Sequence, residues 1–152
     1  MDKPLERPPS LTVAENVWAS FRFAWAGICY TFRTQRNFRI QIGIGIVALC
    51  LALFLRLSAL KFLCVCLTIV VVLALELLNT AIEAVVDLTI GKTFHPLAKT
   101  AKDCSAGAVL VAAVGSLIVA VVLFLPPLAA KFAFVFGSLC LSLPSNGNWY
   151  DR

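Results

Sequence analysis

Charged residues are scarce in this chain of 152 residues. They make up 14% of the sequence, whereas a soluble domain carries roughly 25%. Apolar residues make up 61%, and the mean hydropathy is +0.92. This composition excludes a soluble globular enzyme, a disordered tail and a secreted module. The sequence therefore predicts a single-domain, all-α integral membrane protein.

The excess of positive charge is also small. Thirteen Lys and Arg residues against eight Asp and Glu residues give a net charge of +5, spread along the chain. A surface that binds nucleic acid needs a larger and denser excess, so we expect no nucleic-acid partner. Most basic residues lie before the first apolar run and in the loop after the second. This bias predicts a cytoplasmic N-terminus and a cytoplasmic second loop.

The sequence lacks the usual motifs for metal ligands and phosphate loops. It has one histidine, and its six cysteines show neither disulfide nor zinc spacing, so we interpret them as packing residues. Gly43 and Gly45 lie in an apolar run with no lysine after them, so they form no glycine-rich phosphate loop. A nucleotide site in this chain would have to be built from helix faces and a loop.

Three runs without charge predict three membrane-spanning helices: Ile40–Leu55, Phe62–Leu75 and Cys104–Ala130. A span needs about 20 residues to cross the hydrocarbon core, and the first two runs are shorter than that. The second run reaches this length only by including Glu76 and Asn79. Ionisable side chains are costly inside the apolar layer, so they are candidates for a functional site.

The N-terminal part of the chain differs from these spans. Residues 1–11 are polar and rich in proline, which predicts a disordered lead-in. A helix is expected to begin at Val13, with aromatic residues on one side and basic residues on the other. This pattern favours an amphipathic helix on the membrane surface, although it also fits a helix packed on protein.

The C-terminal part is harder to assign. We expect the third span to run from Ser105 to Pro126 and Pro127, so that residues 12–127 form the membrane domain. Residues 128–152 are then an extension of unknown role. Its apolar part could be a fourth crossing, an interfacial helix or a hairpin.

One face of the second span carries its polar side chains. At 100° per residue, four of them share an arc of about 80°: Glu76, Asn79, Glu83 and Asp87. Glu76 and Glu83 are two turns apart, roughly 10 Å along the helix axis. We therefore expect Glu76 within the apolar layer and Glu83 close to the cytoplasmic surface.

This separation predicts different roles for the two carboxylates. A carboxylate in an apolar setting resists ionisation, so Glu76 is suited to taking a proton from a lipid hydroxyl. Glu83 is suited to holding Mg²⁺, which prefers carboxylate oxygens, water and phosphates. Asn79 can orient a hydroxyl or a carboxylate without adding charge.

The loop after this helix brings more polar residues to the same side of the membrane. Lys102 can neutralise phosphate, and Asp103 can orient it or contact a nucleotide. His95 precedes Pro96 and fits a turn residue as well as a ligand. From the residues alone, three interpretations stay open: an enzyme, a small proton- or cation-coupled transporter that uses Glu76, and a structural membrane subunit.

Three blocks occur in order along the chain: Arg33–Ile40, Glu76–Asp87 and His95–Asp103. In these blocks the sequence resembles the small prokaryotic integral-membrane diacylglycerol kinase and undecaprenol kinase family. The resemblance extends from about Glu15 to Pro127. It implies a homotrimer in the prokaryotic plasma membrane, whose active sites are shared between subunits on the cytoplasmic side.

The resemblance also implies a reaction and its residues. The implied enzyme is an ATP- and Mg²⁺-dependent lipid kinase, which transfers the γ-phosphoryl group to a lipid alcohol, either undecaprenol or diacylglycerol. The segments His95–Lys99 and Ala106–Leu110 resemble the undecaprenol kinases slightly more, so undecaprenol is slightly favoured. Glu76 matches the catalytic base at the lipid hydroxyl, and Asn79 its supporting residue. Glu83 matches a Mg²⁺ ligand. Five residues match positions around ATP and its metal: Gln35, Glu83, His95, Lys102 and Asp103.

Gln35 is a departure from this family, because a second metal-binding glutamate usually stands at its position. An amide oxygen can still coordinate Mg²⁺, but it brings no negative charge. We therefore expect weaker metal binding, or a different ligand.

Overall fold

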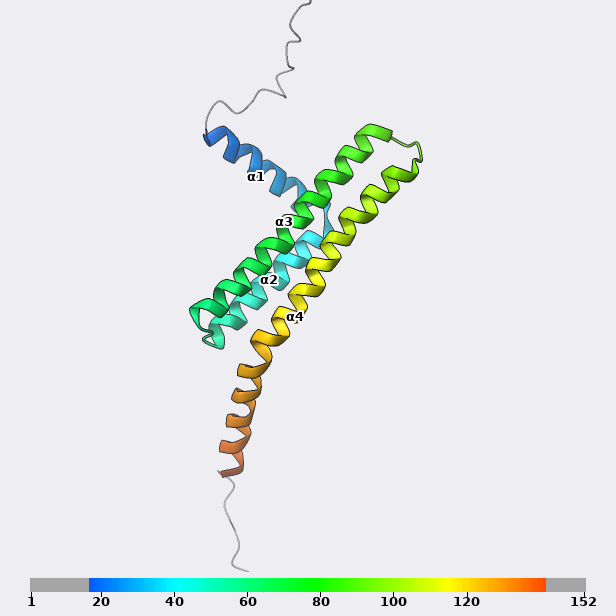
Figure 1. The fold of residues 1–152 in the computed structure, drawn as a ribbon. Helices are drawn as coiled ribbons and strands as arrows, with labels where there is room; N and C mark the ends of the chain where they lie inside the picture. Colours follow the sequence, from blue (N-terminus) through cyan, green and yellow to red (C-terminus); the bar gives the residue numbers. More distant parts are fainter. Residues whose placement is uncertain (1–16, 142–152) are drawn as a thin grey trace, which may run out of the picture.

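The computed structural model describes residues 17–141, and the side chains of residues 17–134. This part forms four helices, drawn in Figure 1: α1 (Val17–Thr34), α2 (Arg36–Phe54), α3 (Ala59–Ile90) and α4 (Pro96–Leu141). The last three are long and apolar enough to cross a membrane. The expected all-α class with three spans is confirmed. The lead-in at residues 1–11 and the helix start at Val13 lie outside the described residues.

Two reversals of the chain bring the polar ends of the helices together. A short turn joins α2 to α3, and Gly91 ends α3 with a positive φ of 56°. Glycine adopts this backbone conformation without steric cost, which suits it to a helix C-terminus. As a result α2, α3 and α4 run alongside one another, with neighbours in opposite directions (Figure 1). The start of α2, the second half of α3 and the start of α4 therefore lie near one end of the bundle.

The connection between α1 and α2 is a single residue. Gln35 has an extended backbone, and its N–H still donates to the carbonyl of Thr31, at 2.8 Å. This break lets α1 leave the bundle at a steep angle (Figure 1). Large aromatic side chains of α1 are exposed, including Trp18, Phe21 and Trp25. An exposed aromatic face of this kind is compatible with the expected position along a membrane surface.

The apolar core lies toward the other end of the bundle. Ala52 and Leu55 at the end of α2 pack with Val65 of α3 and Phe124 of α4. Gly45 allows α2 to approach α3 closely, because a Cβ at this position would lie 3.1 Å from Ile69 Cγ2. Many other large apolar side chains of the spans are exposed, as expected for helices surrounded by lipid.

The helix of the third span does not end at the two prolines, where the sequence analysis expects the span to end. Pro126 and Pro127 lie inside α4, which continues to Leu141 (Figure 1). Residues 128–141 are therefore neither a hairpin nor a separate helix, but the last turns of the same helix. Lys131 anchors this part, since its Nζ donates to the carbonyl of Phe54 at 3.1 Å and lies 3.9 Å from the centroid of that ring.

Candidate active site

Glu83 lies where the α1–α2 junction meets α3. Its carboxylate is half-buried and accepts two hydrogen bonds from side-chain amides. Gln35 Nε2 lies 3.3 Å from Oε2, and Asn79 Nδ2 lies 3.1 Å from Oε1. Each carboxylate oxygen is therefore held by a different amide. The structure brings Gln35 and Glu83 together, although they are 48 residues apart in the sequence.

Asn79 links this carboxylate to α4. Its Oδ1 accepts a hydrogen bond from Ser105 Oγ at 2.6 Å, and both residues are only 8% exposed. Ser105 is not among the residues that the sequence predicts for the site, because its position marks only the start of a span. One signal could have identified it, because Ser105 follows Lys102 by three residues and so lies on the same face of α4.

Glu76 lies two turns below Glu83 on the same face of α3. It is 2% exposed, and Gln41 of α2 donates from Nε2 to its Oε2 at 3.3 Å. Gln41 Oε1 is buried and has no hydrogen-bond partner among the described residues. Gln41 is likewise absent from the residues predicted for the site, although it is the single amide in the run Ile40–Leu55.

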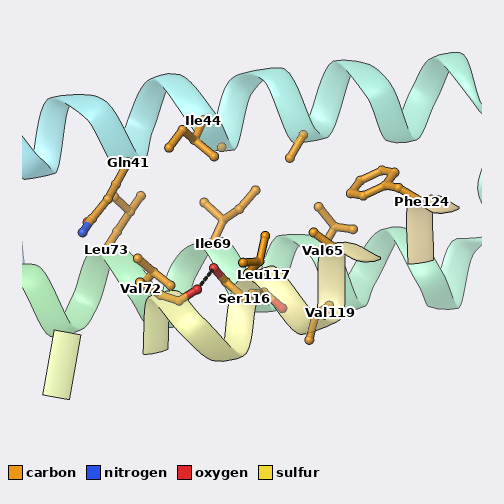
Figure 2. A pocket seen from close by; sticks show the side chains of 15 residues that line it. Gln41, Ile44, Val65, Ile69, Val72, Leu73, Ser116, Leu117, Val119 and Phe124 are labelled. Atoms are coloured by element: carbon orange, nitrogen blue, oxygen red, sulfur yellow. Dashed lines mark hydrogen bonds between the residues drawn. The ribbon is translucent and has the colours of Figure 1, made fainter. Parts of the chain in front are cut away.

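An apolar cavity begins beside this buried pair. It has a volume of about 350 Å³ and lies between α2, α3 and α4. Figure 2 shows Gln41 at one end of the cavity and Phe124 toward the other, with aliphatic side chains such as Ile69 along the walls. The cavity therefore joins a hydrocarbon-like interior to a polar end that holds Gln41 and, through it, Glu76.

Charged residues lie beyond Glu83, at the outer end of α3. Lys102 Nζ contacts Asp87 Oδ1 at 2.5 Å, which ties the start of α4 to α3. Lys99 and Asp103 form an exposed ion pair at 2.7 Å on α4 itself. These contacts show that the basic start of α4 lies one turn beyond Glu83.

His95 has a local role at the start of α4. Its Nδ1 accepts a hydrogen bond from the backbone N–H of Leu97 at 3.3 Å, as a helix cap does. Within the described part of the chain, neither His95 nor Asp103 forms a hydrogen bond or ion pair with Glu83. The predicted residues around ATP therefore form two groups in one chain: Gln35 with Glu83, and the charged start of α4.

The donors around Glu83 fit a cation that brings its own ligands. No group of three His, Cys, Asp or Glu residues in the described part of the chain could hold a metal ion alone. Mg²⁺ is commonly bound by one or two carboxylates together with water and phosphates. Glu83 supplies one carboxylate, and an amide oxygen of Gln35 could join it after rotation of that side chain.

The sequence is similar to known proteins over most of its length. The family described as prokaryotic diacylglycerol kinase matches residues 22–124, a range that contains every site residue described above. A diacylglycerol kinase of Synechocystis sp. is 53% identical over 126 residues, which cover 83% of this chain and 71% of the relative. An undecaprenol kinase of Bacillus subtilis is 46% identical over 109 residues, which cover 72% of this chain and 88% of the relative.

Proposed function

The chain belongs to the prokaryotic diacylglycerol kinase family, and from this we infer that it is a membrane-bound kinase that phosphorylates a lipid alcohol with ATP. Its three apolar helices suit a substrate that stays in the bilayer. Neither relative named above is a transporter, so the alternative of a proton- or cation-coupled transporter has no support.

We propose that Glu76 is the catalytic base. The observation that carries this assignment is a buried carboxylate next to the polar end of an apolar cavity. The hydrocarbon chain of the lipid can lie in the cavity, which leaves its hydroxyl beside Gln41 and Glu76. Gln41 Nε2 donates to Glu76 Oε2 and so holds the carboxylate at the polar end of the cavity. Removing the hydroxyl proton as the oxygen attacks phosphorus assists the transfer.

The phosphate end of the site is proposed around Glu83. Glu83 would hold Mg²⁺, with Gln35 as a neutral second ligand and Asn79 as support. A bound Mg²⁺ supplies positive charge that neutralises the phosphates. Lys102 would add a further charge once it leaves Asp87. Positioning and charge neutralisation account for most of the catalysis in such reactions.

The remaining ATP contacts are assigned to His95 and Asp103 of a neighbouring subunit. This proposal is supported by their hydrogen bonds within one chain, which are local to α4 and do not involve Glu83. A homotrimer with shared sites would bring the two groups together. The distribution of basic residues supports a cytoplasmic position for this end of the bundle, where ATP is available.

The decisive experiment measures phosphate transfer in mixed micelles. Purified protein is supplied with labelled ATP, Mg²⁺ and either undecaprenol or diacylglycerol, and we expect label in a lipid, with undecaprenol preferred. Glu76→Gln should lower turnover roughly 100-fold or more while ATP binding is retained. Thr89→Val is the matched control on α3, because that exposed hydroxyl bonds only to the carbonyl of Val85. Wild-type protein that is folded and labels neither lipid would contradict the proposed function.

A further inference from the structure

Ser105 offers a hydroxyl to the site from α4. Its Oγ lies 2.6 Å from Asn79 Oδ1 and 2.9 Å from the backbone carbonyl of Lys102. A hydroxyl has one hydrogen, so it can donate a full hydrogen bond to only one of these two oxygens at a time.

The chemistry of Glu83 decides the direction of these bonds. An ionised carboxylate only accepts hydrogen bonds, so the NH₂ group of Asn79 must face Glu83, as the contact at 3.1 Å has it. The amide oxygen of Asn79 then necessarily faces Ser105. Because that oxygen also only accepts, the contact at 2.6 Å requires Ser105 to donate. The bonds therefore run in one direction, from Ser105 through Asn79 to Glu83.

Burial makes this hydroxyl difficult to replace. Asn79 and Ser105 are each 8% exposed, so bulk water has little access to the amide oxygen. A buried acceptor that loses its donor is destabilised, and the amide can relieve this only by turning or shifting. Either movement would withdraw the N–H that holds Glu83 Oε1. The rotamer of Glu83 would then depend on Gln35 alone.

We propose that Ser105 is a positioning residue for the kinase reaction: its hydroxyl fixes the Asn79 amide and, through it, the Glu83 carboxylate. The inference rests on the proposed role of Glu83 at the phosphate end of the site. It also gives α4 a second link to α3, below the ion pair between Lys102 and Asp87. The helix that carries Lys102 and Asp103 is thereby held in register with the carboxylate that would bind the cation.

A purely structural role for Ser105 predicts different behaviour. In that case the loss of the hydroxyl would lower the unfolding temperature, while Mn²⁺ binding by the folded protein would stay unchanged. A positioning role weakens cation binding in the folded protein, and it acts only through Asn79, so its effect disappears when the Asn79 side chain is removed. Mn²⁺ binding separates the two roles, and a double-mutant cycle tests whether the effect passes through Asn79.

The experiment compares wild type with Ser105→Ala, Asn79→Ala and the double variant in the micelle assay. We expect Ser105→Ala to lower kcat about tenfold and to raise the Mg²⁺ half-saturation concentration several-fold. KM for the lipid alcohol should stay within about twofold, because the Gln41–Glu76 pair and the cavity are unchanged. On the Asn79→Ala background, Ser105→Ala should cause no further loss.

Binding of Mn²⁺ alone, followed by electron paramagnetic resonance, gives a readout that is independent of turnover. Ser105→Ala should weaken it, and Ser105→Thr, which keeps the hydroxyl, should restore it. Thr100→Val is the control on α4, since that exposed hydroxyl bonds only to the carbonyl of Pro96. Thermal unfolding of every variant identifies any that fails to fold. If Ser105→Thr fails to fold, Mn²⁺ binding by Ser105→Ala and the double-mutant cycle with Asn79 still test the positioning role of Ser105.

Three results would overturn the inference: wild-type behaviour of Ser105→Ala, an equal loss with and without Asn79, or a folded Ser105→Thr that restores nothing. Wild-type protein that binds ATP but phosphorylates no lipid would instead contradict the proposed function. The two failures are therefore distinguishable.

Discussion

Gln35 changes the electrostatics of the site around Glu83. Two carboxylates at this separation would repel each other unless a cation lay between them. With an amide at position 35, Gln35 and Glu83 instead form a hydrogen bond of 3.3 Å. A cation at the proposed site would therefore compete with the N–H groups of the two amides that hold Glu83.

This competition leads to a prediction for Gln35→Glu. The substitution adds a charged ligand and removes the hydrogen bond, so the Mg²⁺ half-saturation concentration should fall several-fold. The metal-free variant should unfold at a lower temperature than wild type, because two carboxylates now face each other. Added Mg²⁺ should raise its unfolding temperature more than it raises that of wild type.

Mg²⁺ titrations of kinase activity and of thermal unfolding check this prediction. Gln35→Met serves as the control, since it keeps the size of the side chain and offers neither a donor nor an oxygen ligand. Identical Mg²⁺ titrations for Gln35→Glu and wild type would show that position 35 does not face the cation.

At the scale of single residues, the sequence predicted the face of α3 but not its partners. The helical spacing of Glu76, Asn79 and Glu83 placed them on one side of the helix, and the structure has all three in contact with other helices or with each other. Gln41 and Ser105 were missed for a physical reason. Their significance depends on the register of α2 and α4 against α3, which tertiary packing fixes and local spacing does not reveal.

At the scale of elements, the unbroken course of α4 through Pro126 and Pro127 is the main departure from expectation. Proline in a helix interior costs about 3 kcal/mol in water, so two in succession indicate a helix end. In an apolar layer, however, each backbone group left without a hydrogen bond costs several kcal/mol. Ending the helix would leave several such groups, so continuing it with a bend is less costly.

The extension after the prolines contributes to stability through Lys131. This side chain donates to the carbonyl of Phe54 at the C-terminus of α2 and lies over the ring of the same residue. A cation at a helix C-terminus and a cation–π contact each contribute roughly 0.5 to 1 kcal/mol. Lys131→Met should therefore lower the unfolding temperature by a few degrees.

Kinase activity of the folded Lys131→Met variant should equal that of wild type, because the contact lies at the opposite end of the bundle from Glu83. Lys131→Arg retains the charge and should keep most of the stability. Thermal unfolding in micelles provides the measurement. An unchanged unfolding temperature for Lys131→Met would show that the contacts of Lys131 with Phe54 do not stabilise the protein.

At the scale of the whole molecule, the hydrogen bonds within one chain divide the proposed site residues into two groups. Glu76 and Glu83 of α3 bond to Gln41 and Gln35. Asp103 lies on the exposed side of α4 and pairs there with Lys99. Charge and hydropathy predict that all these residues lie toward one side of the membrane. They do not predict which of the residues contact one another within one chain, because that depends on helix packing.

The proposal of a trimer with shared sites leads to a quantitative prediction for mixed subunits. Glu76→Gln and Asp103→Asn should each be nearly inactive alone. In a shared site, Glu76 of one subunit works with Asp103 of its neighbour. A subunit carrying Asp103→Asn still supplies Glu76, and a subunit carrying Glu76→Gln still supplies Asp103. A site between these two subunits is therefore intact when the first supplies the base and the second supplies Asp103. Random mixing in equal amounts produces this arrangement at about a quarter of all sites, and sequential purification through two affinity tags removes the trimers made of one variant. Every trimer that contains both variants has one intact site of its three, so the purified mixed trimers should recover about a third of the wild-type turnover. Sites formed within single subunits would recover none, since every subunit then carries one inactivating change.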